Sequence, residues 1–98
     1  MGNSIYLNSD GGFIEVKPKG EKFTLAELQQ LVGGNIQIVY MEDDDNRVMV
    51  VNEDGLIKRL PFNESASWLL GMYVGERGRN NPALIRGNVL IVDKDKID

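Results

Sequence analysis

The chain contains neither cysteine nor histidine in its 98 residues. Without cysteine, disulfides and thiol chemistry are excluded, which fits a reducing compartment. Without histidine, the commonest general base and metal ligand is missing. A serine nucleophile would then need a lysine or a carboxylate as its base, and no such partner stands out for Ser65 or Ser67. We therefore expect a protein that is not an enzyme and that has no catalytic residues, no metal site and no cofactor.

Long apolar runs and an excess of positive charge are also missing. No apolar run approaches the length of a membrane span, and the first residues do not follow the pattern of a signal peptide. The formal net charge of -4 argues against sequence-independent binding of duplex DNA, because such binding requires a basic face. These absences predict a cytoplasmic protein that binds neither a membrane nor duplex nucleic acid.

The composition that remains is that of an ordinary globular protein, with 42% hydrophobic and 27% charged residues. A chain of this length forms a single domain, here residues 1–98, and its core is small. Because a small core gives limited stability, association of several copies would help, and we expect a homo-oligomer.

The clearest local pattern covers residues 24–40. Thr24 can cap a helix and pair reciprocally with Glu27, which is the arrangement of a capping box. Four apolar residues then recur at helical spacing and share one face: Leu25, Leu28, Leu31 and Val32. Gly33 and Gly34 end the helix, because glycine accepts the left-handed conformation. Residues 36–40 alternate in polarity and predict a strand with one buried face.

The rest of the chain predicts five further strands and a second helix. The strands are expected at residues 4–8, 13–17, 47–52, 56–60 and 84–92, the last with a bulge at Gly87. Asn63 is a suitable N-cap for a helix at about residues 63–73. Residues 93–98 form a charged tail that is expected to fray. The order β-β-α-β-β-β-α-β predicts an α+β fold with a mostly antiparallel sheet, and it leaves open which face of the sheet the helices cover.

An arginine-rich loop, residues 74–86, is the most suggestive stretch for function. It contains three of the five arginines, with only Glu76 opposing them. Arginines beside glycine-exposed backbone amides suit phosphate, and the two aromatic residues just upstream could stack on a base. The candidate ligand-binding residues are Arg77, Arg79, Arg86, Tyr73, Trp68 and Gly78. The alternatives remain open: a solvated loop whose arginines pair with acidic turns, and a tryptophan that belongs to the core or to a subunit interface.

Three segments carry a family resemblance: LQQLVGGNIQIV, VMVVNEDGLIKRLPFNESAS and IRGNVLIVD. Together they resemble an uncharacterised family, the domain of unknown function 3846, over about residues 14–93. The resemblance implies a short protein from phages, plasmids or bacteria, and it implies no activity. The segment MYVGERGRNNPA departs from the family pattern, because it is longer and more basic than the family leads us to expect.

The mobile-element setting implied by this resemblance suggests a first hypothesis. Small phage proteins without catalytic residues often inhibit host defence, and one kind sequesters an immune signal. The protein would hold a phosphorylated nucleotide, of the cyclic oligonucleotide or cyclic ADP-ribose type, at junctions between its subunits. Capture alone would block anti-phage immunity, and the protein would act in the cytoplasm of the bacterial host.

The second hypothesis is an interaction protein with an acidic surface. The acidic residues gather in the turn at 42–45, at Glu53 and Asp54, and in the tail at 93–98. The turn lacks the glycine and the distal glutamate of an EF-hand, so a solvated hairpin tip is the better interpretation than a cation site. Such a surface could mimic nucleic acid or dock on a basic host protein.

Overall fold

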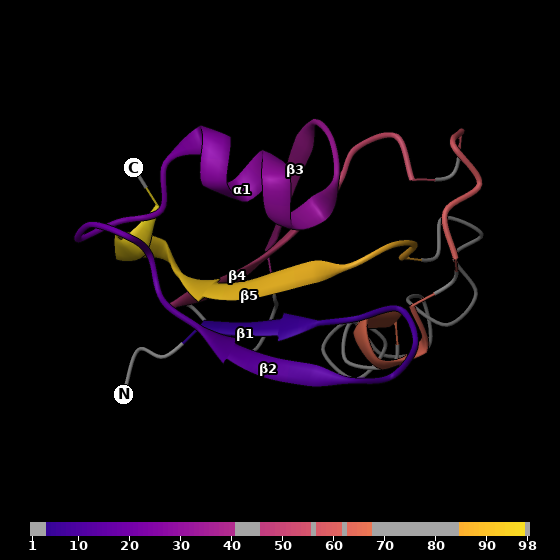
Figure 1. Cartoon of the computed structure of the whole chain (residues 1–98), viewed down its shortest axis with the longest axis horizontal. Helices are drawn as coiled ribbons and strands as arrows, with labels where there is room; N and C mark the ends of the chain where they lie inside the picture. The colour runs from indigo at the N-terminus through magenta and orange to yellow at the C-terminus, as the bar shows by residue number, and fades with distance from the viewer. Residues whose placement is uncertain (1–3, 41–45, 56, 62, 68–84, 98) are drawn as a thin grey trace.

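A five-stranded antiparallel sheet forms the centre of the fold (Figure 1). The computed structural model describes residues 4–40, 46–55, 57–61, 63–67 and 85–97. The elements are β1 (Ser4–Leu7), β2 (Phe13–Val16), α1 (Leu25–Val32), β3 (Ile36–Tyr40), β4 (Arg47–Asn52), β5 (Val89–Asp93) and the 3-10 turn η1 (Lys94–Lys96). Residues 64–67 are also helical. The predicted α+β class, with an antiparallel sheet and two helices, is confirmed.

The strand order is β2-β1-β5-β4-β3, and every pair of neighbours is antiparallel. Two hairpins, β1–β2 and β3–β4, therefore lie on either side of the last strand. Ile91 of β5 faces Ile5 of β1 on one side and Met49 of β4 on the other. The C-terminal strand β5 therefore joins the two hairpins into one sheet.

Helix α1 begins and ends where the sequence predicted. The Thr24 hydroxyl accepts a hydrogen bond from the Glu27 backbone N–H at 3.2 Å, and the Glu27 carboxylate accepts one from the Thr24 N–H at 3.0 Å. Gly33 has a φ of 81° and donates its N–H to Gln29 at 2.8 Å. The capping box and the glycine stop are both confirmed, because both depend on contacts within a few residues.

The two helices cover opposite faces of the sheet, which the sequence left open. Leu28 and Val32 of α1 are buried against one face, formed by Val48, Val50, Leu90 and Val92. Ala66, from the helical residues 64–67, is buried with the opposite face, formed by Met49, Val51, Val89 and Ile91. Figure 1 shows α1 above the sheet and residues 64–67 below it. Strands β4 and β5 are therefore apolar on both faces, as their valine-rich sequences require.

The predicted strand at 56–60 is wrong. Residues 57–59 form turns instead, in which Lys58 donates to the Asp54 carbonyl at 2.8 Å and Leu60 donates to the Gly55 carbonyl at 2.9 Å. These two backbone N–H groups bond to carbonyls within the same turn and not to a neighbouring strand. The last strand also begins later than predicted, at Val89, because Gly87 is left-handed, with a φ of 82°, and donates to Pro61 at 2.7 Å.

The C-terminal end is packed where the sequence predicted a frayed tail. Residues Lys94–Lys96 form one 3-10 turn, and Ile97 pairs in parallel with Phe23. The Phe23 N–H donates to the Lys96 carbonyl at 2.7 Å, and the Ile97 side chain packs at the margin of the α1-side core. Ile97 supplies the apolar anchor that the charged residues around it conceal in the sequence.

Candidate functional site

Asn63 joins three separate segments at one end of the sheet. Its side-chain oxygen accepts the Ala66 N–H at 3.0 Å, which confirms the predicted N-cap. Its amide nitrogen donates to the carbonyls of Leu7, at 3.2 Å, and Gly87, at 2.8 Å. The residue is fully buried, with 0% exposure. The end of β1, the start of the helical residues and the segment before β5 are therefore held in fixed positions.

A second contact joins the two residues that flank the arginine-rich segment. The Ile85 N–H donates to the Ser67 hydroxyl oxygen at 3.1 Å, and that hydroxyl donates to the Ile85 carbonyl at 3.4 Å. Residues 67 and 85 flank residues 68–84, which lie outside the part of the chain that the structure describes. The two residues that flank this segment, Ser67 and Ile85, are therefore in direct contact, and Arg86 follows Ile85 in the sequence.

Arg86 is held against the turn that follows β4. Its Nη1 donates to the Leu60 carbonyl at 3.2 Å. Gly55 lets the two segments approach, because a Cβ at this position would lie 3.2 Å from the Arg86 carbonyl oxygen. A guanidinium carries five N–H donors in a rigid fork, so one bond to Leu60 orients the group and leaves further donors for a ligand. The side chain is half-buried.

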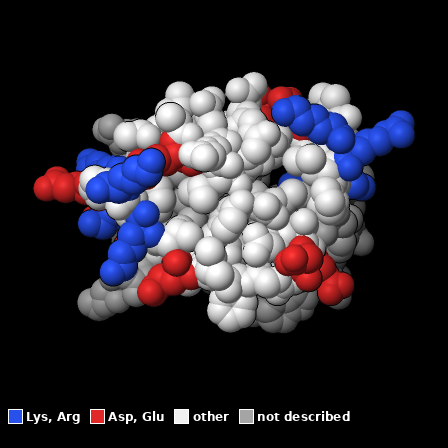
Figure 2. Space-filling model, viewed as in Figure 1, with Lys and Arg blue, Asp and Glu red and all other residues white. Residues whose placement is uncertain are grey.

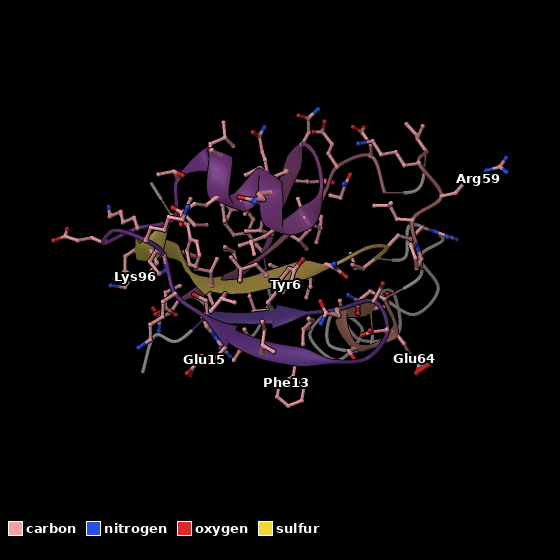
Figure 3. The ribbon with its side chains drawn as sticks, in the orientation of Figure 1. Tyr6, Phe13, Glu15, Arg59, Glu64 and Lys96 are labelled. Carbon is pink, nitrogen blue, oxygen red and sulfur yellow. The ribbon has the colours of Figure 1, made fainter. Side chains whose placement is uncertain are left out.

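The same turn contributes two more cations, Lys58 and Arg59. The Lys58 Nζ lies against Gly34, 2.8 Å from where a Cβ would stand, just beyond the C-terminal end of α1. A cation suits that place because the last carbonyls of a helix carry partial negative charge. Arg59 is exposed and left-handed, with a φ of 55°. Figure 3 shows its side chain pointing away from the protein.

Lys58, Arg59 and Arg86 together are named the basic end. Figure 2 shows Lys and Arg side chains, with an acidic side chain beside them, where Figure 1 places residues 57–61, and a further group of Lys and Arg at the opposite end, near η1. The whole chain carries a net charge of -4, so this local excess of positive charge runs against the overall balance. The basic end therefore offers three cations to an anionic ligand, with Glu53 and Asp54 preceding them in the chain.

The predicted binding residues are only partly placed. Arg86 lies at the basic end, while Arg77, Arg79, Tyr73, Trp68 and Gly78 fall outside the described residues. Lys58 and Arg59 were missed, because the run LIKRLP was assigned to a strand. The signal was available in NEDG, since a turn signal that ends three residues before Lys58 favours exposed cations on a loop.

The acidic turn at 42–45 also lies outside the described residues, but its flanks are described. The Lys94 Nζ stands 5.6 Å from the centre of the Tyr40 ring, and the Lys94 N–H donates to the Asn46 carbonyl at 2.8 Å. Arg47 faces Asp93 across β4 and β5. Cations therefore accompany the acidic residues at this end, which weakens the case for a purely acidic docking surface.

The described residues contain neither a metal-binding cluster nor a membrane-spanning helix. No group of three or more Asp or Glu side chains is placed to hold a metal ion there. No helix in that part of the chain has the length and the apolar character needed to cross a membrane.

The comparison with known proteins gives a family. Residues 4–98 match the family model described as Domain of unknown function (DUF3846). The chain belongs to this family. The match extends the resemblance seen in the sequence to nearly the whole chain, including β1 and η1 of the DUF3846 fold. No curated protein and no solved structure matches the chain.

Proposed function

We propose that this DUF3846 protein is a non-catalytic binding protein that sequesters a small phosphorylated ligand of the nucleotide class. The observation that supports this proposal is the basic end of an otherwise acidic chain. Arg86 is oriented by Leu60, Arg59 is exposed, and the Ser67–Ile85 contact joins the two residues that flank the segment in which Arg77 and Arg79 occur. Arginine suits phosphate because its planar fork makes two parallel charge-assisted hydrogen bonds.

In this proposal each part of the site has a separate role. Arg86 binds phosphate with little loss of side-chain freedom, because its hydrogen bond already fixes the guanidinium. Arg59, Arg77 and Arg79 supply further charge, and Tyr73 or Trp68 stacks on the base. Binding without bond cleavage would remove a signal by affinity alone. The phage and plasmid setting implied by the family resemblance gives such capture a use, since it would block host anti-phage immunity.

A thermal-shift screen of the purified protein tests the proposal. The panel holds cyclic dinucleotides, cyclic trinucleotides and ADP-ribose isomers, with mononucleotides and inorganic phosphate as controls. A ligand that binds only the folded protein at a hundred times its Kd adds about 2.7 kcal/mol, which raises Tm by roughly 10–20 °C for a domain of this size. A flat screen with a well-folded protein would count against a nucleotide-class ligand.

Point variants then test the location of the site. Arg77→Ala and Arg79→Ala should lose the ligand-induced shift, because each removes a cation of the proposed site between Ser67 and Ile85. Both variants should keep the Tm of the free protein. Lys96→Ala removes a cation from the far end (Figure 3) and should keep the full shift. If both arginine variants bind as tightly as the original protein, the proposed site is wrong.

A further inference from the structure

Among the described residues, no strand pairs with the outer edge of β2, which also exposes apolar side chains. β2 is the first strand in the sheet order, and β1 is its neighbour. Phe13 is 69% exposed and Ile14 is 54% exposed. These two residues are adjacent, and they lie on opposite faces because side chains alternate along a strand. An edge strand with such exposure is a template for pairing with another strand.

The hairpin register shows which backbone groups are available at this edge. Asn8 donates to Gly12 at 2.8 Å and Gly11 donates to Asn8 at 3.1 Å, so the hydrogen-bonded ladder begins at the Asn8–Gly12 pair. Hydrogen-bonded and non-bonded pairs alternate in an antiparallel ladder, and Tyr6 faces Ile14. The Phe13 and Glu15 backbone groups therefore point outward, to the free edge, while those of Ile14 and Val16 point to β1.

We propose that two copies of this chain pair antiparallel through their β2 edges, with Val16 on the two-fold axis. Of the self-pairings that align the outward-pointing groups, three have their axis within residues 14–16. An axis at Glu15 sets two carboxylates opposite each other, and an axis at Ile14 sets Glu15 opposite Phe13. An axis at Val16 sets Glu15 opposite Lys17 on both sides, so each charge has a partner. Charge complementarity selects this third pairing.

The selected pairing also covers apolar surface. Val16 packs at the margin of the α1-side core, so its own copy continues that core across the axis. Ile14 lies on the same face as Val16 and becomes covered by the partner. Pro18 lies two residues beyond the end of β2, and in the selected pairing it faces Ile14, a non-hydrogen-bonded position between the subunits, so its missing N–H removes no intermolecular bond. The product is one continuous sheet of two subunits.

The paired edges leave the basic end open. Figure 3 shows Phe13 and Glu15 at the lower border of the protein, away from Arg59 at the upper right. Because the two surfaces are separate, this inference does not rest on the proposed ligand. A closed two-fold pair also removes the β2 edge from further association.

Single-cysteine variants test the register directly, because the chain has no cysteine of its own. In a non-hydrogen-bonded pair the opposed Cα atoms lie about 4.5 Å apart, which is within the range of a disulfide. Val16→Cys should form a covalent dimer under mild oxidation, faster than Ile14→Cys. Faster cross-linking of Ile14→Cys, or none in either variant, overturns the proposed register.

Charge variants test the pairing in solution, by size-exclusion chromatography with light scattering. The original chain should elute as a dimer. Glu15→Lys should weaken dimerisation about tenfold or more, since lysines then oppose each other twice, and the double variant Glu15→Lys with Lys17→Glu should restore it. Glu21→Lys makes the same charge change outside β2 and should leave the dimer intact. A monomer at every concentration, a growing open assembly, or loss in the Glu21 variant as well overturns the proposal.

Discussion

At the scale of single residues, Asn63 holds together the junction of the end of β1, the start of helical residues 64–67 and the segment before β5. Replacing it with alanine removes the hydrogen bonds that its side chain makes with the Ala66 N–H and with the carbonyls of Leu7 and Gly87, in a fully buried place. Unpaired buried groups cost about 1–3 kcal/mol each before relaxation, and a lost cap costs about 1 kcal/mol. We expect Asn63→Ala to lower the free energy of unfolding by about 2–4 kcal/mol in urea denaturation.

Asn35 provides the matched control, because it is exposed. Asn35→Ala should change stability by less than about 0.5 kcal/mol. Asn63→Asp should cost at least as much as the alanine change at neutral pH. The cap would remain, but a carboxylate would face two carbonyl oxygens. Equal effects of Asn63→Ala and Asn35→Ala would show that the junction does not stabilise the fold.

Arg59 has a backbone conformation that suits glycine better. Its φ is 55°, and the bond from the Leu60 N–H to the Gly55 carbonyl spans the six-residue closure found at helix ends with a left-handed residue. A side chain in this region costs about 1–2 kcal/mol, partly offset because glycine loses more freedom on folding. We expect Arg59→Gly to raise the free energy of unfolding by about 0.5–1 kcal/mol.

The same variant separates stability from binding. Arg59→Gly removes a cation of the basic end, so it should weaken binding of the proposed ligand while it raises the Tm of the free protein. Arg59→Lys keeps both the charge and the strained backbone, so it should keep binding without the gain in stability. A Tm unchanged or lowered by glycine would show that the left-handed turn is not strained.

At the scale of elements, the capping box of α1 makes stability depend on pH. The pKa of Glu27 lies below its usual value of 4.5 because the carboxylate accepts backbone N–H bonds, first from Thr24 and then from Lys19. A lowered pKa contributes stability that is present above the unfolded value and is lost as the pH falls through the folded value. Glu27→Gln should therefore be less stable than the original chain at neutral pH, and the difference should narrow as the pH falls below about 4.5.

Urea denaturation of both proteins across this pH range measures the difference in their free energies of unfolding. Taking the difference cancels the effects of titrating groups that the two proteins share. Glu21→Gln is the control, because it changes an exposed glutamate close to the same helix. Its free energy of unfolding should differ little from that of the original chain, and this difference should not change with pH. A Glu27→Gln difference that does not narrow in acid would mean that the charge of the carboxylate is unimportant to the cap.

Elements defined by near neighbours were predicted from the sequence, and long-range features were not. Thr24, Glu27 and Gly33 fix α1 within a few residues, and the glycines at 11 and 12 fix the first hairpin. The place of β5 between the hairpins depends on partners far away in the chain, and no local pattern encodes it. For the same reason the sequence predicted Arg86 as a binding residue, since it belongs to an arginine-rich segment, but did not predict Lys58 and Arg59. Their place beside Arg86 follows from the long-range hydrogen bond that Arg86 donates to the Leu60 carbonyl.

At the scale of the whole molecule, the proposed site sets local charge against net charge. The chain carries -4 overall, so an anion is repelled at long range and attracted only near the basic end. At physiological salt the Debye length is about 8 Å, so charges on the far end of the molecule are largely screened at the site. Affinity should then depend on where a cation lies and not on the total charge.

Arg59→Ala and Lys96→Ala test this argument, because each lowers the net charge by one at opposite ends of the molecule (Figure 3). With the ligand selected by thermal shift, Arg59→Ala should raise the Kd by about tenfold, the effect of losing one charge-assisted contact of roughly 1.5 kcal/mol. Lys96→Ala should change it by less than about twofold, since its charge is screened. Isothermal titration at physiological salt measures both. Equal losses would show that the ligand responds to the overall field, and the basic end would then no longer explain binding.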